Sequence, residues 1–411
     1  MRRIHSWYYI ISPGILVAAT GVGAGDLIFA SFAGSNIGLT ILWVVVIGAL
    51  LKWMLAEGLA RWQMATNTTL LEGSIRHLPR STQWIFLIYL LIWSLGVAAA
   101  LIYACGVAAS GLFPLGETDI SNRIWGIFHA LLGFVLVLRG GYRLFEKLMS
   151  FFIGIMFVTV ILTAILINPD WSSFASGLFI PRIQSGKNLL WTIGVLGGVG
   201  GSLTLLSYGY WIREKRRSGL QGIKECRLDL TVGYTMTALF GIAMIVIGSK
   251  TTISQQGATV ALDLANQLAT ILGNYGRWIF LTGFWGAVFS SLLGVWQSVP
   301  YIFADFYFLQ KGISISENQE LNLTTTKPYK FYLLGLTFVP LPMLWFPFDI
   351  VQTNYALLGA IFMPLLAYAL LILNNRKEWI SEKFRNGFLT NSLLIVTLLF
   401  FMYFVYIKVY G

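Results

Sequence analysis

The sequence predicts an all-α polytopic membrane protein, in which two inverted groups of five helices are followed by an eleventh helix. Three observations support this fold class. Of the 411 residues, 57% are hydrophobic and only 11% are charged, and the mean hydropathy is +0.73. Apolar runs repeatedly reach the roughly 20 residues that a helix needs to cross a bilayer. Two of these runs contain glycine-rich gaps at matching places along the chain.

Eleven apolar segments are expected to cross the membrane. They are 13–33, 39–60, 82–113, 122–141, 145–168, 189–211, 228–249, 274–306, 329–346, 349–374 and 388–408. The chain 1–411 is thus one transmembrane transporter domain, with a first repeat at 13–168, a second at 189–374 and an additional helix at 388–408. An odd number of spans in each repeat makes the second enter the membrane from the opposite side, which inverts it.

The net charge of +11 is best explained by topology. Most Lys and Arg residues fall on the side that holds the N-terminus, as in "REKRRSG" from Arg213. Because positive loops stay in the cytoplasm, the N-terminus is expected inside and the C-terminus outside. The partners are then the lipid bilayer and a small inorganic ion, with no nucleic acid. We expect a monomer in a bacterial inner (plasma) membrane.

The two gaps lie in "ILVAATGVGAGDLIFASFAG", from Ile15, and "IGVLGGVGGSLTLLSYGYW", from Ile193. Glycine weakens a helix interior by about 1 kcal/mol relative to alanine. One interpretation is close helix packing, for which small residues are common in membranes. The other is a pair of broken helices, which in inverted repeats indicate a transporter binding site. The density and matched positions of the glycines favour the second interpretation.

Several motifs resemble those of the Nramp (natural resistance-associated macrophage protein) transporter family. "SPGILVAATGVGAGD" is followed by 17 residues that end in Leu42-Trp43, as in the family's first two helices. "LARWQMATNTTLLE", "RGGYRLFEKLM", "INPDW" and "GAVFSSLLG" resemble further family motifs. The resemblance implies a LeuT-type fold of 5+5 helices with helices 1 and 6 broken.

The residues that bind metal in the family do not carry over. Its D-P-G-N motif in the first helix matches Gly23, Ala24, Gly25 and Asp26, so only the glycine is kept. In the sixth helix, the family's metal-selecting methionine matches Gly201. The family histidines there match Leu203 and Tyr208, and the third-helix acids implied in proton transfer match Ala98 and Leu101. The chain is therefore similar to a divergent Nramp protein, and any coupling to protons is expected to differ from the family's.

Main-chain N–H groups and hydroxyls are expected to form the substrate site. Glycines allow close approach of the backbone, and the N-terminal end of each second half-helix favours negative charge. The predicted substrate-binding residues are Thr20, Gly21, Gly23, Gly25, Asp26, Gly197, Gly198, Gly200, Gly201, Ser202, Thr204 and Tyr208. Transition metals prefer imidazole or sulfur ligands, and the gaps contain no His, Met or Cys. No metal site and no cofactor are predicted.

Four polar residues leave alternatives open. Asp26 either caps the half-helix beside it or ligates a cation. Lys52 lies inside a span, where charges are usually functional. It is either a counter-charge for an anion or part of a structural bridge with Glu57 or Asp26. Gln352 and Asn354 are auxiliary candidates.

The sequence therefore favours a secondary transporter of a small oxyanion such as bicarbonate, working by alternating access. The first alternative is a divalent metal cation (Mn, Fe or Mg) carried through an atypical site. A further alternative is a non-transporting sensor or scaffold. An enzyme is not expected, because catalytic motifs are missing from the sequence.

Overall fold

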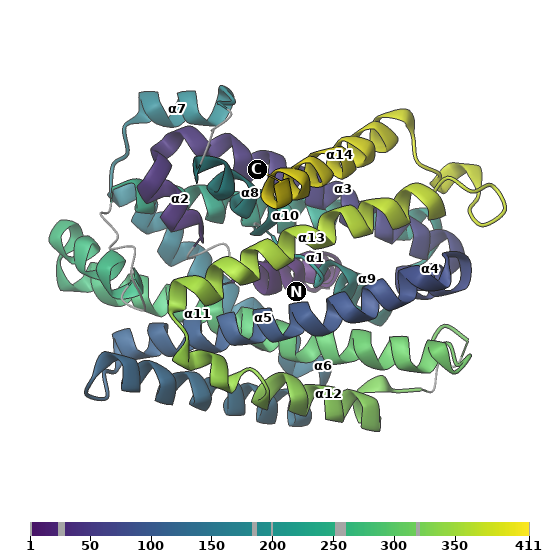
Figure 1. The fold of residues 1–411 in the computed structure, drawn as a ribbon, viewed down its shortest axis with the longest axis horizontal. Helices are drawn as coiled ribbons and strands as arrows, with labels where there is room; N and C mark the ends of the chain where they lie inside the picture. Colours follow the sequence, from purple (N-terminus) through teal and green to yellow (C-terminus); the bar gives the residue numbers. More distant parts are fainter. Residues whose placement is uncertain are drawn as a thin grey trace.

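The fold is a bundle of helices (Figure 1). The computed structural model describes residues 2–23, 29–182, 187–198, 200–250, 260–317 and 321–410, and these contain no strand. The helices are α1 (Arg2–Gly21), α2 (Ala30–Ile37), α3 (Leu42–Thr66), α4 (Leu70–His77), α5 (Arg80–Leu112), α6 (Thr118–Leu166), α7 (Trp171–Phe179), α8 (Lys187–Gly198), α9 (Leu205–Glu214), α10 (Gly219–Ser249), α11 (Val260–Gln310), α12 (Lys327–Phe338), α13 (Phe348–Leu373) and α14 (Phe388–Tyr410). The all-α prediction is confirmed.

Seven stretches in the described part of the chain are long and apolar enough to cross a membrane. They are Ala30–Thr66, Arg80–Leu112, Thr118–Gly140, Leu144–Leu166, Gly219–Ser249, Gly273–Gln310 and Phe348–Leu373. Several of the eleven expected spans are shorter in the structure. The sixth is split into α8 and α9, and α12 ends at Phe338, short of the expected span 329–346. Proline accounts for that early end, because Pro340 and Pro342 cannot continue a regular helix.

The two glycine-rich gaps interrupt the helices where the sequence predicts. The first helix ends at Gly21, and α2 begins only at Ala30. The sixth span is divided in the same way, because α8 ends at Gly198 and α9 begins at Leu205. The prediction that helices 1 and 6 are broken is therefore confirmed.

Helix α10 packs tightly against both halves of the first broken span. A Cβ on Gly14 of α1 would overlap the carbonyl oxygen of Asp229, and one on Gly248 would overlap that of Ser31 in α2. Only glycine permits such approaches, as is common between membrane helices. Close helix packing therefore explains these two glycines, which lie outside the gaps.

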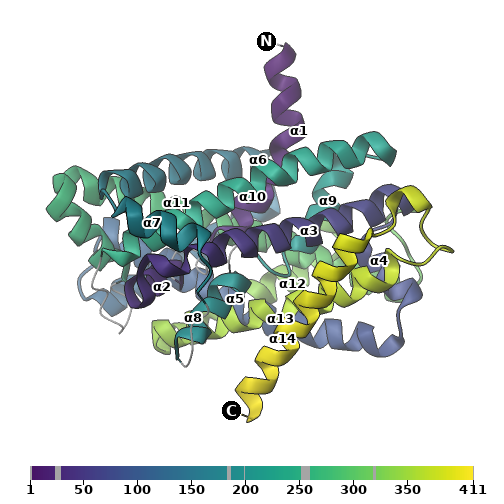
Figure 2. The same ribbon diagram turned by 90° about the horizontal axis from the view of Figure 1, so that it is seen from above.

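The remaining long helices complete the bundle, and the part of α11 from Gly273 to Gln310 is the most buried of the seven membrane-spanning stretches. Helices α5, α6 and α11 contact one another, and α12 packs on α11. Figure 2 shows the N-terminal end of α1 projecting beyond the bundle, and α14 crossing its periphery, where it packs against α13. The described residues that border the two breaks, 21–23 and 200–204, are buried inside the bundle.

Candidate functional site

The main chains of the two gaps touch inside the bundle. A Cβ on Gly21, the last residue of α1, would lie 2.7 Å from the carbonyl carbon of Gly200. One on Gly201 would lie 3.3 Å from the Cα of Gly21. The first distance is too short for a real side chain, so the crossing requires glycine at position 21. The structure thus brings together three of the residues predicted to bind substrate.

Gly200 and Gly201 also adopt a backbone conformation that suits glycine. Their φ angles are 77° and 80°, in the left-handed region that costs other residues about 1–2 kcal/mol. A Cβ on Gly201 would in addition lie 2.6 Å from Oγ1 of Thr204. These two residues turn the chain between α8 and α9, and they place Thr204 directly before the first turn of α9.

Two serines of α11 satisfy carbonyl groups that the end of α1 leaves open. Ser291 donates its hydroxyl to the carbonyl of Thr20 at 2.8 Å, and the Ser290 hydroxyl is shared between the carbonyl of Ala19 at 3.2 Å and that of Ala287 in its own helix at 2.9 Å. Gly294 makes room for the Thr20 side chain, whose Oγ1 would overlap a Cβ at that position. The sequence marks "GAVFSSLLG" as a family-like motif but assigns it no role at the site. The feature of the sequence that could have indicated this role is a pair of adjacent serines within an apolar span.

Lys52 binds the end of the other broken helix. It is fully buried, and its Nζ donates to the carbonyl oxygen of Gly197 at 2.8 Å. A cation at the C-terminal end of a helix is stabilised by the helix dipole. Glu57, one of the two acids considered as its partner, instead accepts from Arg61 at 2.7 Å and from Arg227 at 2.9 Å. The structure therefore places the positive charge of Lys52 at the second gap.

Several buried oxygen atoms near the gaps have no hydrogen-bond partner within the described residues. They are Oγ1 of Thr20, Oγ of Ser202, Oγ of Ser207 and Oε1 of Gln352. Buried polar groups are normally paired with protein or water, because an unpaired one costs about 1–3 kcal/mol. Unpaired oxygens around two broken helices are therefore suited to a polar ligand or to water.

Helix α13 closes the site from a third side. A Cβ on Gly359 would lie 3.5 Å from Oγ of Ser202, and one on Gly197 would lie 2.7 Å from the Cβ of Ala360. Gln352 is buried on the same helix, and its Nε2 donates to the carbonyl of Ala100 in α5 at 2.9 Å. Asn354 is exposed and lies away from the interior. Of the two auxiliary candidates, only Gln352 faces the protein interior.

Tyr208 lies in a different polar cluster. Its hydroxyl donates to Oδ1 of Asp229 at 2.6 Å, and the other oxygen of Asp229 is paired with Arg217 at 2.5 Å. Arg217 also donates to the carbonyl of Ile10 in α1. This cluster ties the first half of α1 to α9 and α10. It gives the Tyr208 hydroxyl a structural partner outside the gaps.

Three positions of the first gap lie outside the described residues. They are Ala24, Gly25 and Asp26. The capping and cation-ligating roles considered for Asp26 therefore stay predictions. Within the described part of the chain, no three His, Cys, Asp or Glu residues are grouped so that they could hold a metal ion.

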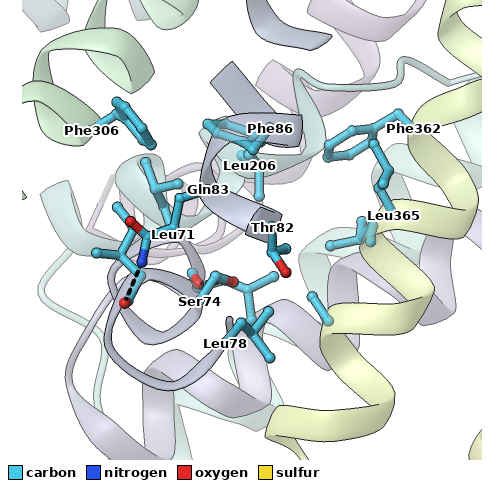
Figure 3. A pocket seen from close by; sticks show the side chains of 14 residues that line it. Leu71, Ser74, Leu78, Thr82, Gln83, Phe86, Leu206, Phe306, Phe362 and Leu365 are labelled. Carbon is cyan, nitrogen blue, oxygen red and sulfur yellow. Dashed lines mark hydrogen bonds between the residues drawn. The ribbon is translucent and has the colours of Figure 1, made fainter. Parts of the chain in front are cut away.

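Cavities of different character lie away from the crossing. An apolar cavity of about 60 Å³ lies between α4, α5, α11 and α13 (Figure 3), lined by side chains such as Leu71, Phe86 and Phe362. A cavity of about 650 Å³ is polar. Its lining comprises Gln63, Asn67, Thr69, Arg213, Glu214, Arg216, Arg217, Ser218 and Ser316. We call this larger space the vestibule.

Comparison with known families identifies one match over nearly the whole chain. The family described as "Natural resistance-associated macrophage protein-like", or Nramp, matches residues 14–411. A curated relative from Chromohalobacter salexigens, the "Divalent metal cation transporter MntH", is 24% identical over 318 residues, which cover 71% of this chain and 70% of the relative. An uncharacterized protein of Pasteurella multocida is 21% identical over 285 residues, covering 66% and 64% of the two chains.

Solved structures show the same fold. The manganese transporter of Eremococcus coleocola, in complex with an aromatic bis-isothiourea substituted compound, superposes with a TM-score of 0.74 at 16% identity. The match covers 96% of this chain and 85% of that one. MhsT in complex with L-phenylalanine gives a TM-score of 0.55 at 14% identity, covering 94% and 97%. At these identities the likeness concerns the fold alone.

Proposed function

The chain belongs to the Nramp family of membrane transporters, and from this premise we propose that it moves a small inorganic ion by alternating access. The ion would bind where the two gaps cross. Irregular backbone at membrane depth persists only where protein or a water-filled space satisfies it. The contact of Gly21 with Gly200 and the unpaired oxygens around it support this location.

A divalent metal cation is the cargo that the relatives support best. Curated relatives carry the name "Divalent metal cation transporter MntH". The observation on this chain that favours a cation is the set of buried, unpaired oxygens, including Oε1 of Gln352. Hard cations such as Mg²⁺ and Mn²⁺ bind oxygen ligands, and Mg²⁺ keeps several of its waters. The site would thus hold a partly hydrated ion through amide, hydroxyl and main-chain oxygens, with Asp26 as its acid.

A small oxyanion such as bicarbonate is the second candidate, and Lys52 favours it. A buried ammonium group bonded to Gly197 brings positive charge to the second gap. Such a charge repels a divalent cation and attracts an anion. Hydroxyls of Thr20 and Ser202 can donate to an anion as readily as they accept from a cation's water.

Two membrane properties complete the proposal. Both gaps belong to one chain, so a monomer contains the whole site. The excess of Lys and Arg in alternate loops supports a cytoplasmic N-terminus and an outside C-terminus. We place the protein in a bacterial inner membrane.

Flux into liposomes that contain the purified protein tests the proposal. Quenching of an internal metal-sensitive dye by added manganese would support the cation. A bicarbonate-driven change of internal pH without such quenching would support the anion. Protein-free liposomes and a Gly201→Met variant are the controls, because a side chain at position 201 fills the crossing. Wild-type protein that moves neither ion, or a variant that matches the wild type, would contradict the proposal.

A further inference from the structure

Asp305 is a buried acid outside the candidate ion site. It lies near the end of α11 and has no exposed surface. Its Oδ2 accepts from the Tyr210 hydroxyl at 2.8 Å and, at a long 3.4 Å, from the Thr69 hydroxyl. Its Oδ1 has no hydrogen-bond partner within the described residues. A fully buried carboxylate with one good hydrogen bond is poorly compensated for the loss of water.

The charged groups around Asp305 do not neutralise it. Glu72 of α4 and Arg213 of α9 are the charged side chains that face it, and Tyr210 and Tyr301 are the titratable phenols nearby. Arg213 donates to the carbonyl of Ile315. No ion pair involves Asp305 in the described part of the chain.

Glu72, by contrast, is fully satisfied as a carboxylate. It pairs with Arg76 at 2.6 Å, and it accepts from the hydroxyls of Ser314 at 2.6 Å and Ser316 at 2.8 Å. Two acids thus face each other with very different partners. A buried carboxylate without such partners is more stable in its neutral form, so Asp305 rather than Glu72 is the acid suited to hold a proton.

A route for a proton leads to Asp305 from the vestibule. Thr69 lines the vestibule, and its hydroxyl points to Oδ2 of Asp305. The same hydroxyl accepts from the main-chain N–H of Glu72 at 3.1 Å, so its own hydrogen is available to the carboxylate. Thr69 therefore lies between Asp305 and a large polar cavity.

We propose that Asp305 is a proton-binding site that exchanges protons with the vestibule and controls the packing of α9. A hydronium ion in the vestibule gives its proton to the carboxylate, which leaves water and a neutral acid, and the release reverses this step. The neutral acid keeps Tyr210 of α9 packed against α11. The ionised form needs water beside it, and this water loosens the packing of α9 against α4 and α11.

Infrared spectroscopy of the full chain in liposomes tests the proton directly. The carbonyl band of a protonated carboxylic acid is expected at neutral pH in the wild type and is lost in Asp305→Asn. Asp229→Asn is the matched control, because Asp229 is equally buried but paired with Arg217, and it should keep the band. A wild type without the band, or an Asp305→Asn variant that retains it, would overturn the proposal.

The relay is tested with a variant that leaves the acid in place. Thr69→Val should slow hydrogen–deuterium exchange of the Asp305 proton by about tenfold or more, because the hydroxyl between acid and vestibule is gone. Thr337→Val is the control, since Thr337 is a buried hydroxyl that bonds to Leu333 of its own helix. Equal rates of hydrogen–deuterium exchange in Thr69→Val and Thr337→Val would contradict the role of Thr69 as a proton relay. An acid band that disappears in sodium chloride and returns in choline chloride would identify a sodium site and overturn the proton assignment. None of these measurements depends on the cargo.

Discussion

The contact between the two gaps can be tested by adding one methyl group. In Gly21→Ala, the new Cβ would lie 2.7 Å from the carbonyl carbon of Gly200 and 2.9 Å from the nitrogen of Gly201. Both are main-chain atoms in a tight turn, so neither can rotate away. Overpacking of a filled interior costs about 1–3 kcal/mol. The variant should therefore push the two gaps apart.

The matched control is Gly154→Ala. Gly154 lies inside α6, and a Cβ there would meet no atom within 4 Å. Alanine is favoured over glycine in a helix by about 1 kcal/mol, so this variant should be slightly stabilised. The free energies of unfolding of the two variants should thus differ by about 2–4 kcal/mol. Thermal unfolding in detergent measures the difference.

The same variants should differ in ion flux. If the clash costs about 2 kcal/mol, the ratio of molecules with an intact crossing to molecules with separated gaps falls by roughly thirtyfold. Flux of manganese or bicarbonate into liposomes should fall in Gly21→Ala and remain at the wild-type level in Gly154→Ala. Equal stability and equal flux in the two variants would refute the argument that the gaps touch at a functional site.

Three further predictions concern the residues around the gaps and one surface histidine. Lys52→Met removes a charge-assisted hydrogen bond to the carbonyl of Gly197 and should lower the free energy of unfolding by about 1.5–3 kcal/mol, measured in detergent; with a positive charge removed from the second gap, anion affinity in a flux assay should fall, whereas a cation would bind more tightly. Ser291→Ala leaves the carbonyl of Thr20 unpaired and should lower the free energy of unfolding by about 1–3 kcal/mol, measured against the wild type in detergent. Burial, helped by the charge of Arg76, lowers the pKa of His77 from its usual 6.5. The folded state then binds fewer protons than the unfolded state, so stability is complete above about pH 6.5 and falls as the pH drops through the two pKa values. A melting curve against pH should show this fall, and His77→Gln should remove it.

The sequence predicted the broken helices because glycine density is a local property. "GVGAG" and "GGVGG" disfavour a helix wherever they occur, and the breaks at Gly21 and Gly198 follow from them. The long apolar runs likewise predicted membrane-spanning helices. In contrast, the early end of α12 at Phe338 depends on two prolines, and the mean hydropathy of the span does not reveal their effect.

The contacts of the site could not be predicted in the same way. A span that is apolar all round has no polar stripe to mark its outer face, so the sequence cannot tell that Gln352 faces inward and Asn354 outward. Serines in membrane helices often bond to their own helix. The bond from Ser291 to Thr20 therefore becomes visible only when two distant segments are placed side by side.

The open carbonyl groups at the two helix breaks accept hydrogen bonds from different neighbouring helices. This difference bears on how the broken helices can move. The last carbonyls of α1 are held by serines of α11, whereas the carbonyl of Gly197 near the end of α8 is held by Lys52 of α3. Carbonyl groups at membrane depth cannot be left unpaired without a cost of several kcal/mol. A movement that carries α1 away from α11 must therefore supply water or new donors to Ala19 and Thr20. A movement that keeps α8 with α3 needs no such exchange, so α3 and α8 should travel as one unit while the end of α1 changes partners.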